Sequence, residues 1–254
     1  IGTFHSICSR LLRMEADNLG IARDFVIYDD ADSRALIKRC LIELGLGNKE
    51  KEYHPSAVLG QISAAKNMLI RPDSFAIGKD DEWTRNIGRV YARYQEMLRQ
   101  ANAFDFDDLL TQSVWLLEKH PLVLEKYRER FKHILVDEYQ DTNTAQFELL
   151  KLLAEPGSDN TECNICVVGD DDQSIYKFRG ANIYNILNFE KVFPDTTTIR
   201  LEQNYRSTRN ILNAANGVIS NNTMRKEKKL WSKKGDGIPI DYIRYGSDFE
   251  EACG

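Results

Sequence analysis

The sequence predicts an α/β protein whose sheet-forming part is interrupted by a block of helices. Two short apolar runs, at 134–136 and 163–168, are each followed by a polar loop and then by a helical pattern. Strands that alternate with helices in this way favour a parallel sheet. From about 29 to 103 the apolar spacing is helical throughout. This block is therefore an insertion into the α/β domain or a separate neighbour.

The elements before residue 104 follow from apolar spacing and from residues that break helices. The stretch from His5 to about Gly20 carries a helical stripe, and residues 25–28 form a short β-like run. Pro55 and Pro72 separate helices inside the block. Its clearest helical face repeats with a period of 3.6 residues and comprises Ile87, Val90, Tyr91, Tyr94, Met97 and Leu98.

The elements after residue 104 alternate between strand and helix. The run at 134–136 precedes a helix with Ala145, Leu149, Leu150 and Leu153 inward, and the run at 163–168 precedes a helix with Ile183, Ile186 and Leu187. We expect another strand near Thr198–Leu201, followed by a helix that Ser207 caps.

Composition indicates an ordinary water-soluble globular chain. The 254 residues are 42% hydrophobic and 29% charged, and no apolar run approaches the roughly 18 residues of a membrane helix. The net charge of -5 argues against bulk adhesion to nucleic acid, so DNA binding would need a local groove. An odd count of five cysteines and the lack of a signal peptide favour the cytoplasm. Because the chain starts at Ile1 instead of Met, we expect it to be a piece of a longer one.

One cysteine pair has the C-x-x-C spacing of zinc sites. Cys163 and Cys166 lie in the predicted strand, where residues three apart point to opposite faces of a sheet. No second pair completes a site, so we expect no zinc.

Three segments carry residue types suited to nucleotide and nucleic-acid chemistry. Asp137 and Glu138 follow a strand, where ligands of α/β proteins bind, and in nucleotide hydrolases such acids hold Mg²⁺ and activate water. In 176–179 two aromatic residues alternate with Lys and Arg, a pattern suited to stacking on bases and contacting phosphates. In 201–207 an Arg follows a Tyr just before a helix. Each segment alone also fits a plainer alternative: an acidic turn after a strand, an aspartate-rich surface loop whose two aromatic rings belong to the core, and a capped helix start with an exposed Arg.

Together and in order, five segments resemble those of the superfamily 1A DNA helicases of the UvrD/Rep family. Their amino-acid sequences are most similar to those of Gram-positive members. These segments are TFHS at 3–6, FDFDDL at 104–109, DEYQD at 137–141, GDDDQSIYKFRGA at 169–181 and LEQNYRS at 201–207. The helical block also resembles that family, for example at 61–67, so the likeness covers essentially the whole chain. It implies a RecA-like motor, an ATP-dependent helicase that moves 3′ to 5′ on single-stranded DNA and unwinds duplex DNA.

The resemblance also implies residue roles. For ATP and Mg²⁺, Asp137 would be the metal ligand, Glu138 the catalytic base and Gln173 the γ-phosphate sensor; Tyr205 would stack on the adenine and Arg206 would reach the γ-phosphate. The single-stranded DNA path would be lined by His5, Phe106, Tyr176, Phe178 and Arg179. The family often has Trp at the position of Phe178, a change that keeps an aromatic face.

One element of the family is missing from the sequence. No G-x-x-x-x-G-K-S/T phosphate loop occurs, and Gly78-Lys79 is followed by Asp80 inside the helical block. In the family this loop precedes the Thr3–Ser6 segment. We therefore expect the longer protein to be an enzyme and this piece by itself to be inactive.

The predicted domains are a first RecA-like motor domain (1–24 and 104–194), a helical insertion (25–103) and the start of a second RecA-like domain (195–254). Three alternatives remain open: the helicase part of a recombination helicase-nuclease, a non-catalytic DNA-binding paralogue, and a generic α/β nucleotide hydrolase. DNA repair or replication is the expected context, with unidentified protein partners. The basic stretch 225–234 is either a solvated face or a phosphate contact.

Overall fold

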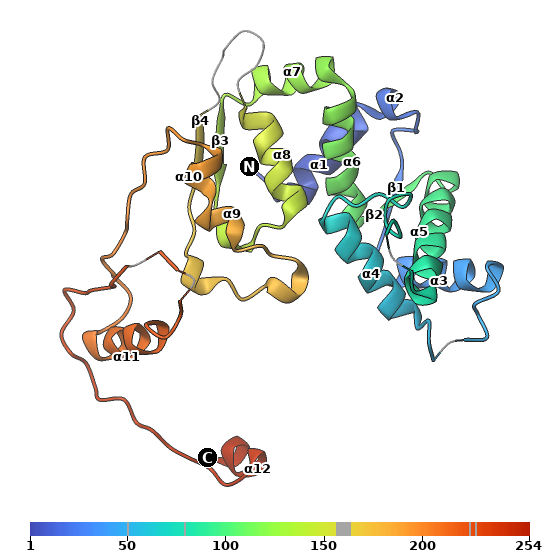
Figure 1. Cartoon of the computed structure of the whole chain (residues 1–254). Coiled ribbons are helices and arrows are strands. Elements are labelled where there is room, and N and C mark those ends of the chain that lie inside the picture. The colour runs from blue at the N-terminus through green and yellow to red at the C-terminus, as the bar shows by residue number, and fades with distance from the viewer. Residues whose placement is uncertain (50, 79, 156–163, 224, 227) are drawn as a thin grey trace. The chain divides into compact units, whose positions relative to one another are not determined.

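The computed structural model describes residues 1–49, 51–78, 80–155, 164–223, 225–226 and 228–254 (Figure 1). Its contacts divide the chain into two compact units, Ile1–Ile186 and Leu187–Gly254. The helices of the first unit are α1 (Phe4–Met14), α2 (Ala16–Leu19), α3 (Asp30–Glu43), α4 (Pro55–Asn67), α5 (Glu82–Gln100), α6 (Phe106–Lys119), α7 (Pro121–Arg130), α8 (Thr144–Ala154) and α9, which runs on to the boundary (Tyr184–Leu187). The second unit contains α10 (Phe189–Val192), α11 (Arg209–Ile219) and α12 (Asp248–Cys253).

Two pairs of parallel strands confirm the predicted α/β class. Strands β1 (Val26–Tyr28) and β2 (Ala103–Asp105) pair in parallel, with Val26 opposite Ala103. Strands β3 (His133–Val136) and β4 (Asn164–Val167) also pair in parallel, with Val136 opposite Val167. Because the carboxyl ends of parallel strands meet at one edge, the loops after β3 and β4 lie side by side.

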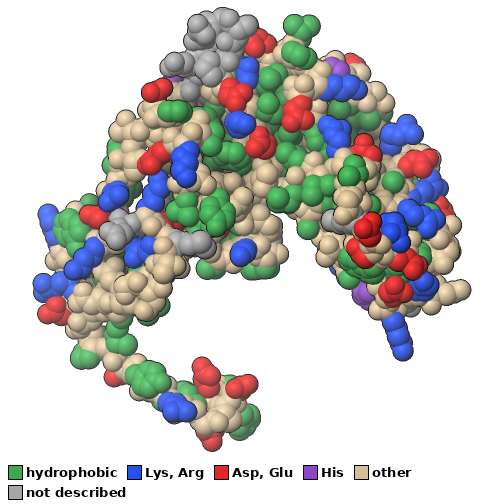
Figure 2. All heavy atoms as spheres, viewed as in Figure 1, with side chains coloured by type: hydrophobic (Ala, Val, Ile, Leu, Met, Phe, Trp, Pro, Cys, Tyr) green, Lys and Arg blue, Asp and Glu red, His purple; other side chains and the backbone are tan. Residues whose placement is uncertain are grey.

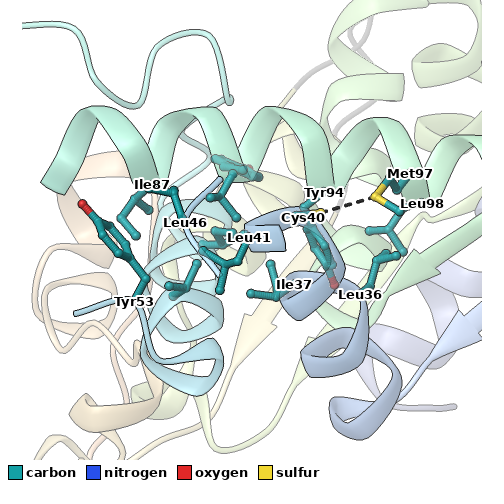
Figure 3. Packing of buried hydrophobic residues seen from close by; sticks show 14 of the residues in the cluster. Leu36, Ile37, Cys40, Leu41, Leu46, Tyr53, Ile87, Tyr94, Met97 and Leu98 are labelled. Carbon is teal, nitrogen blue, oxygen red and sulfur yellow. Dashed lines mark hydrogen bonds between the residues drawn. The ribbon is translucent and has the colours of Figure 1, made fainter. Parts of the chain in front are cut away.

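The first unit contains two hydrophobic cores. The helical-block core joins α3, α4 and α5, and Figure 3 shows Leu41, Ile87 and their neighbours packed beneath α5. All six residues of the predicted face from Ile87 to Leu98 are buried in it. The α/β core joins α1, α6, α7 and α8 through residues such as Leu12, Leu110 and Leu149. The helical block therefore has its own core, as an inserted domain requires.

Side-chain caps explain where the helices around the site begin. Asp105 accepts a hydrogen bond from the backbone N–H of Asp108, and Asp108 accepts one from the backbone of Asp105, so this capping box starts α6. Asn143 and Gln146 form the same box at α8. After α2, Gly20 adopts φ +65° and ends the predicted first helical stretch.

Three predictions need correction or fall outside the described residues. No strand is formed at Thr198–Leu201; among the described residues of this region only Gln203 forms a bridge, to Trp231, and a strand without a neighbour is not stable. The N-cap of α11 is Thr208 and not Ser207, whose backbone N–H bonds to Asn204 instead. Cys163 lies outside the described residues, and Cys166 is exposed on β4.

The surface mixes both signs of charge. Figure 2 shows Lys and Arg side chains interspersed with Asp and Glu side chains over the face in view. In the described part of the chain, no helix has both the length and the apolar character needed to cross a membrane.

Candidate functional site

The turn after β3 carries both acids that the sequence singled out. Asp137 and Glu138 are exposed, and Asp137 Oδ1 accepts a hydrogen bond of 2.9 Å from the backbone N–H of Glu138. Glu138 adopts φ +49° and ψ 43°, the left-handed region that a residue with a side chain rarely occupies. Such strained conformations persist only where the surrounding structure holds them in place, and they concentrate at functional sites.

Gln140 holds this strained turn against the neighbouring loop. Its side chain is 1% exposed, and its Nε2 donates to Glu138 Oε2 at 2.8 Å. Its Oε1 accepts from the backbone N–H of Asp170, in the loop after β4, at 3.0 Å. Sequence reasoning missed this residue, because one of its partners, Asp170, lies 30 residues away in another loop. Gln140 therefore fixes the direction of the Glu138 carboxylate.

The close approach of the two loops requires glycine at position 169. A Cβ atom there would lie 2.7 Å from Gln140 Oε1 and 2.9 Å from Ile186 Cδ1, closer than real contacts allow. The backbone N–H of Tyr139 donates to the carbonyl of Val168 at 2.9 Å. The loops after β3 and β4 are thus joined by backbone and side-chain hydrogen bonds.

The loop after β4 contains a short 3₁₀ helix, η2 (Asp171–Gln173). Gln173 is exposed, and its Nε2 donates to Asp170 Oδ2 at 2.8 Å. Carboxylate oxygens of Asp170, Asp171 and Asp172 all lie within 4.8 Å of one another, a cluster that sequence reasoning did not single out. Clusters of acidic side chains at a protein surface are common without an ion, so we assign none to this cluster.

Asp137 fits the role of a magnesium ligand on its own chemistry. Mg²⁺ prefers carboxylate oxygens together with water and substrate phosphates. The Asp137 carboxylate is exposed at the carboxyl end of β3 and keeps acceptor capacity beyond its bond to Glu138 N–H.

Two predicted DNA-contacting residues from distant parts of the sequence meet in the first unit. The rings of His5, on α1, and Phe106, the first residue of α6, have centroids 5.0 Å apart at an interplanar angle of 46°. Phe106 is 56% exposed, so its ring offers a face to solvent. Burial lowers the pKa of His5, because it disfavours the charged imidazolium.

The second predicted aromatic pair also lies at the surface. Tyr176 is 39% exposed and Phe178 is 78% exposed, so the alternative that both rings are core residues is wrong. Their centroids lie 6.0 Å apart. The backbone between the two rings forms a 3₁₀ helix, η3 (Lys177–Arg179), that ends at Gly180 with φ +87°. The side chain of Arg179 lies outside the described part of the chain.

Tyr205 and Arg206 belong to the second unit, whereas the other predicted site residues belong to the first. Asn204 Oδ1 accepts from the backbone N–H groups of Arg206 and Ser207, at 2.9 and 2.8 Å, which forms a tight turn before α11. Tyr205 is 75% exposed and Arg206 is exposed, so the turn presents both side chains to solvent.

Comparison with known families defines the class of this site. Residues 1–194 match the UvrD/REP helicase N-terminal domain, and residues 199–253 match the UvrD-like helicase C-terminal domain. The chain therefore belongs to the UvrD/Rep helicase family, which confirms the resemblance and the RecA-like α/β fold inferred from the sequence.

Individual relatives narrow the likeness to one group within that family. The chain is 48% identical over 251 residues to the ATP-dependent DNA helicase PcrA of Bacillus subtilis, and 46% identical over 252 residues to PcrA of Staphylococcus aureus. PcrA of Leuconostoc citreum is 44% identical. Each alignment covers 99% of this chain, which spans about a third of the length of these relatives (33–34%).

Proposed function

We propose that this chain is part of an ATP-dependent helicase that moves 3′ to 5′ on single-stranded DNA and unwinds duplex DNA. The observation that carries the proposal is the strained turn at Glu138, whose carboxylate Gln140 holds at the edge of a parallel sheet. The names of the PcrA relatives support ATP and DNA as ligands.

The proposed residue roles are those that the resemblance to the family implies. Asp137 would hold Mg²⁺, which would neutralise charge on the phosphates. Glu138 accepts a proton from the attacking water while Gln140 fixes its orientation, and Gln173 contacts the γ-phosphate. Tyr205 stacks on the adenine, and Arg206 reaches the γ-phosphate from the second motor domain.

The exposed rings form the single-strand path. Phe106 with His5, and Phe178 with Tyr176, stack on successive bases, and Arg179 contacts a phosphate. We assign residues 1–24 and 104–194 to the first motor domain, 25–103 to the inserted domain and 195–254 to the second motor domain. The whole protein acts in DNA repair or replication in the cytoplasm, and this chain alone, without a phosphate loop, does not turn over ATP.

A single substitution tests the assignment in a full-length protein that contains this chain. Glu138→Gln keeps the shape of the side chain and removes the base, so ATP hydrolysis should fall roughly 10²–10⁴-fold while ATP binding persists. Glu129→Gln, at an exposed position of α7, is the matched control. Near-normal turnover of Glu138→Gln would reject the base assignment, and DNA binding without any ATP turnover in the unmodified protein would favour a non-catalytic paralogue.

A further inference from the structure

The last turn of α4 belongs to the helical block, and besides a hydrogen bond from Asn67 to the Ser63 carbonyl one turn earlier it makes polar contacts with the motor part of the chain. Lys66 and Asn67 end this helix, and Leu69 follows in the left-handed conformation, with φ +58°. The side chain of Leu69 packs against the α/β core and not against the core of its own block. This turn is thus the place where the inserted helices contact the motor part of the chain.

Lys66 holds this contact in place through two buried ion pairs. Its side chain is fully buried, and its Nζ lies 2.6 Å from Asp105 Oδ2 and 2.9 Å from Asp108 Oδ1. Tyr94, from α5, donates its hydroxyl to the same oxygen of Asp105 at 2.9 Å. A buried charge held in this way has few alternative positions, because breaking the pair leaves uncompensated charge. The next residue, Asn67, is therefore held in one place relative to the start of α6.

The side chain of Asn67 joins three segments of the motor. Its Nδ2 donates to Asp107 Oδ1 at 3.1 Å, next to the exposed ring of Phe106. Its Oδ1 accepts a hydrogen bond from Asn143 Nδ2. A Cβ placed on Gly180 would lie 3.7 Å from the Asn67 Cβ, so the end of the Tyr176–Gly180 loop passes against it.

Asn143 connects this contact to the hydrolytic turn. It directly follows Thr142, whose Oγ1 donates to the carbonyl of Tyr139 at 2.8 Å. Tyr139 begins the short 3₁₀ helix η1 (Tyr139–Asp141), and the strained Glu138 immediately precedes it. A displacement of Asn143 is thus transmitted through one hydrogen bond and a rigid turn to the Glu138 backbone.

The chemistry of Asn67 suits this position. An amide donates to an ionised carboxylate and accepts from another amide at the same time, whereas Asp can only accept and Ala can do neither. Asp at position 67 would face Asp107 with two acceptors and like charge.

We infer that Asn67 is a positioning residue that couples single-stranded DNA binding to ATP hydrolysis. DNA on Phe106 and on the Tyr176–Phe178 rings shifts Asp107 and Gly180, and Asn67 passes that shift to Asn143 and Glu138. Asn67 contacts neither ligand. The inference rests on the proposed function, since it needs a DNA-stimulated ATP hydrolase.

The test compares ATP turnover with and without a thymidine oligonucleotide in a full-length protein that contains this chain. Asn67→Ala should lower the DNA-stimulated kcat about tenfold, and leave both the DNA-free turnover and the KM for ATP within about twofold of the unmodified protein. Asn18→Ala is the matched control. This substitution on α2 removes a side-chain amide that donates a hydrogen bond of 3.0 Å to Glu15. This control should keep its DNA stimulation.

A reciprocal exchange separates coupling from general damage. Asn67→Asp alone should lose stimulation, and Asn67→Asp with Asp107→Asn should regain part of it, because the donor and acceptor between positions 67 and 107 are restored with their positions exchanged, whereas the bond to the Ser63 carbonyl stays lost.

Three results would overturn the inference. These are stimulation of Asn67→Ala within twofold of the unmodified protein, an equal loss of turnover with and without DNA, and no rescue by the exchange. If the unmodified protein shows no DNA-stimulated hydrolysis at all, the proposed function itself fails and the inference falls with it.

Discussion

The amide of Gln140 hydrogen-bonds to the carboxylate of Glu138, a residue with left-handed backbone, with Nε2 and Oε2 2.8 Å apart. The same amide accepts from the backbone of Asp170, so one buried side chain sets the spacing of two loops. The orientation of the candidate base thus depends on a neutral residue two positions away.

Gln140→Ala should therefore impair both hydrolysis and folding. The Asp170 N–H loses its acceptor, which costs about 1–3 kcal/mol of unfolding free energy when the group stays buried. Turnover should fall about tenfold or more, because the Glu138 carboxylate is no longer oriented. Urea denaturation and steady-state ATP assays measure the two effects. Gln100→Ala, which loses an exposed bond to Glu96, is the control, and an equal effect in both variants would contradict the special role of Gln140.

The strain at Glu138 predicts that glycine is more stable there than alanine. Left-handed backbone costs a residue with a Cβ on the order of 1 kcal/mol, whereas glycine adopts it freely. Both variants lose the carboxylate, so both should be inactive. The free energy of unfolding of Glu138→Gly should be about 1 kcal/mol higher than that of Glu138→Ala. Chemical denaturation of the two purified variants measures the difference. Equal stabilities would show that the turn is not left-handed in solution.

The two lysine–carboxylate pairs with the same 2.6 Å separation should differ widely in energy. Lys66 pairs with Asp105 in a fully buried site, whereas Lys126, 57% exposed, pairs with Glu15. Lys66→Met leaves buried acids uncompensated and should cost about 3–5 kcal/mol. Lys126→Met should cost less, about 1–2 kcal/mol, because Glu15, although only 6% exposed, keeps hydrogen bonds from Tyr127 and Asn18. Thermal and urea unfolding of both variants decide the matter, and similar losses would argue against a buried ion pair at Lys66.

The acid opposite Lys66 predicts a pH dependence of stability. Burial, followed by the Asp105 charge, raises the pKa of Asp108 to about 7, whereas the Lys66 charge holds the pKa of Asp105 below its ordinary value. Between an unfolded pKa of about 4 and a folded pKa of about 7, the native state binds more protons at Asp108. This contribution is complete at low pH and is lost as the pH rises through about 7.

Asp108→Asn removes that titration while keeping the size of the side chain. As the pH rises from about 5 to about 8.5, the unmodified chain should lose on the order of 1–3 kcal/mol of unfolding free energy that the variant does not lose. Urea unfolding at several pH values measures the trend. A pH-independent difference between the two proteins would mean that Asp108 stays ionised throughout.

The exposed rings predict a loss of DNA affinity without a loss of folding. Tyr176→Ala or Phe178→Ala should weaken single-stranded DNA binding by about 1–3 kcal/mol per lost stack. Phe249→Ala is the control, because that ring is 79% exposed, against 78% for Phe178. Fluorescence anisotropy and melting temperature on the same samples separate the cases. Unchanged affinity of the folded Phe178→Ala variant would contradict the stacking role.

Much of the fold could be predicted because its elements carry local signals. The face from Ile87 to Leu98 repeats with the helical period, and β3 is an apolar run that ends in two acids. The prediction of a strand near Thr198–Leu201 was wrong, because a β-like pattern forms a strand only where a neighbouring strand completes its hydrogen bonds.

The candidate site was predicted in its reactive residues but not in their supports. Asp137 and Glu138 have a position in the chain that suggests their chemistry. The roles of Gln140, Lys66 and Asn67 depend on partners in other segments, such as Asp170, Asp105 and Asn143. A spacing rule does not detect such pairs, because the loops that bring them together have no periodic pattern.

The parallel pairing of β1 with β2 gives the helical block a definite topological meaning. Because both strands run in the same direction, the chain that leaves after Tyr28 must travel back before it enters Ala103. The block is thus an enlarged crossover connection, in the place where most parallel pairs have one helix. Because the entropy cost of closing a connection grows only slowly with its length, the crossover can be this long at little cost, provided that the pair between Lys66 and Asp105 at the end of β2 is kept.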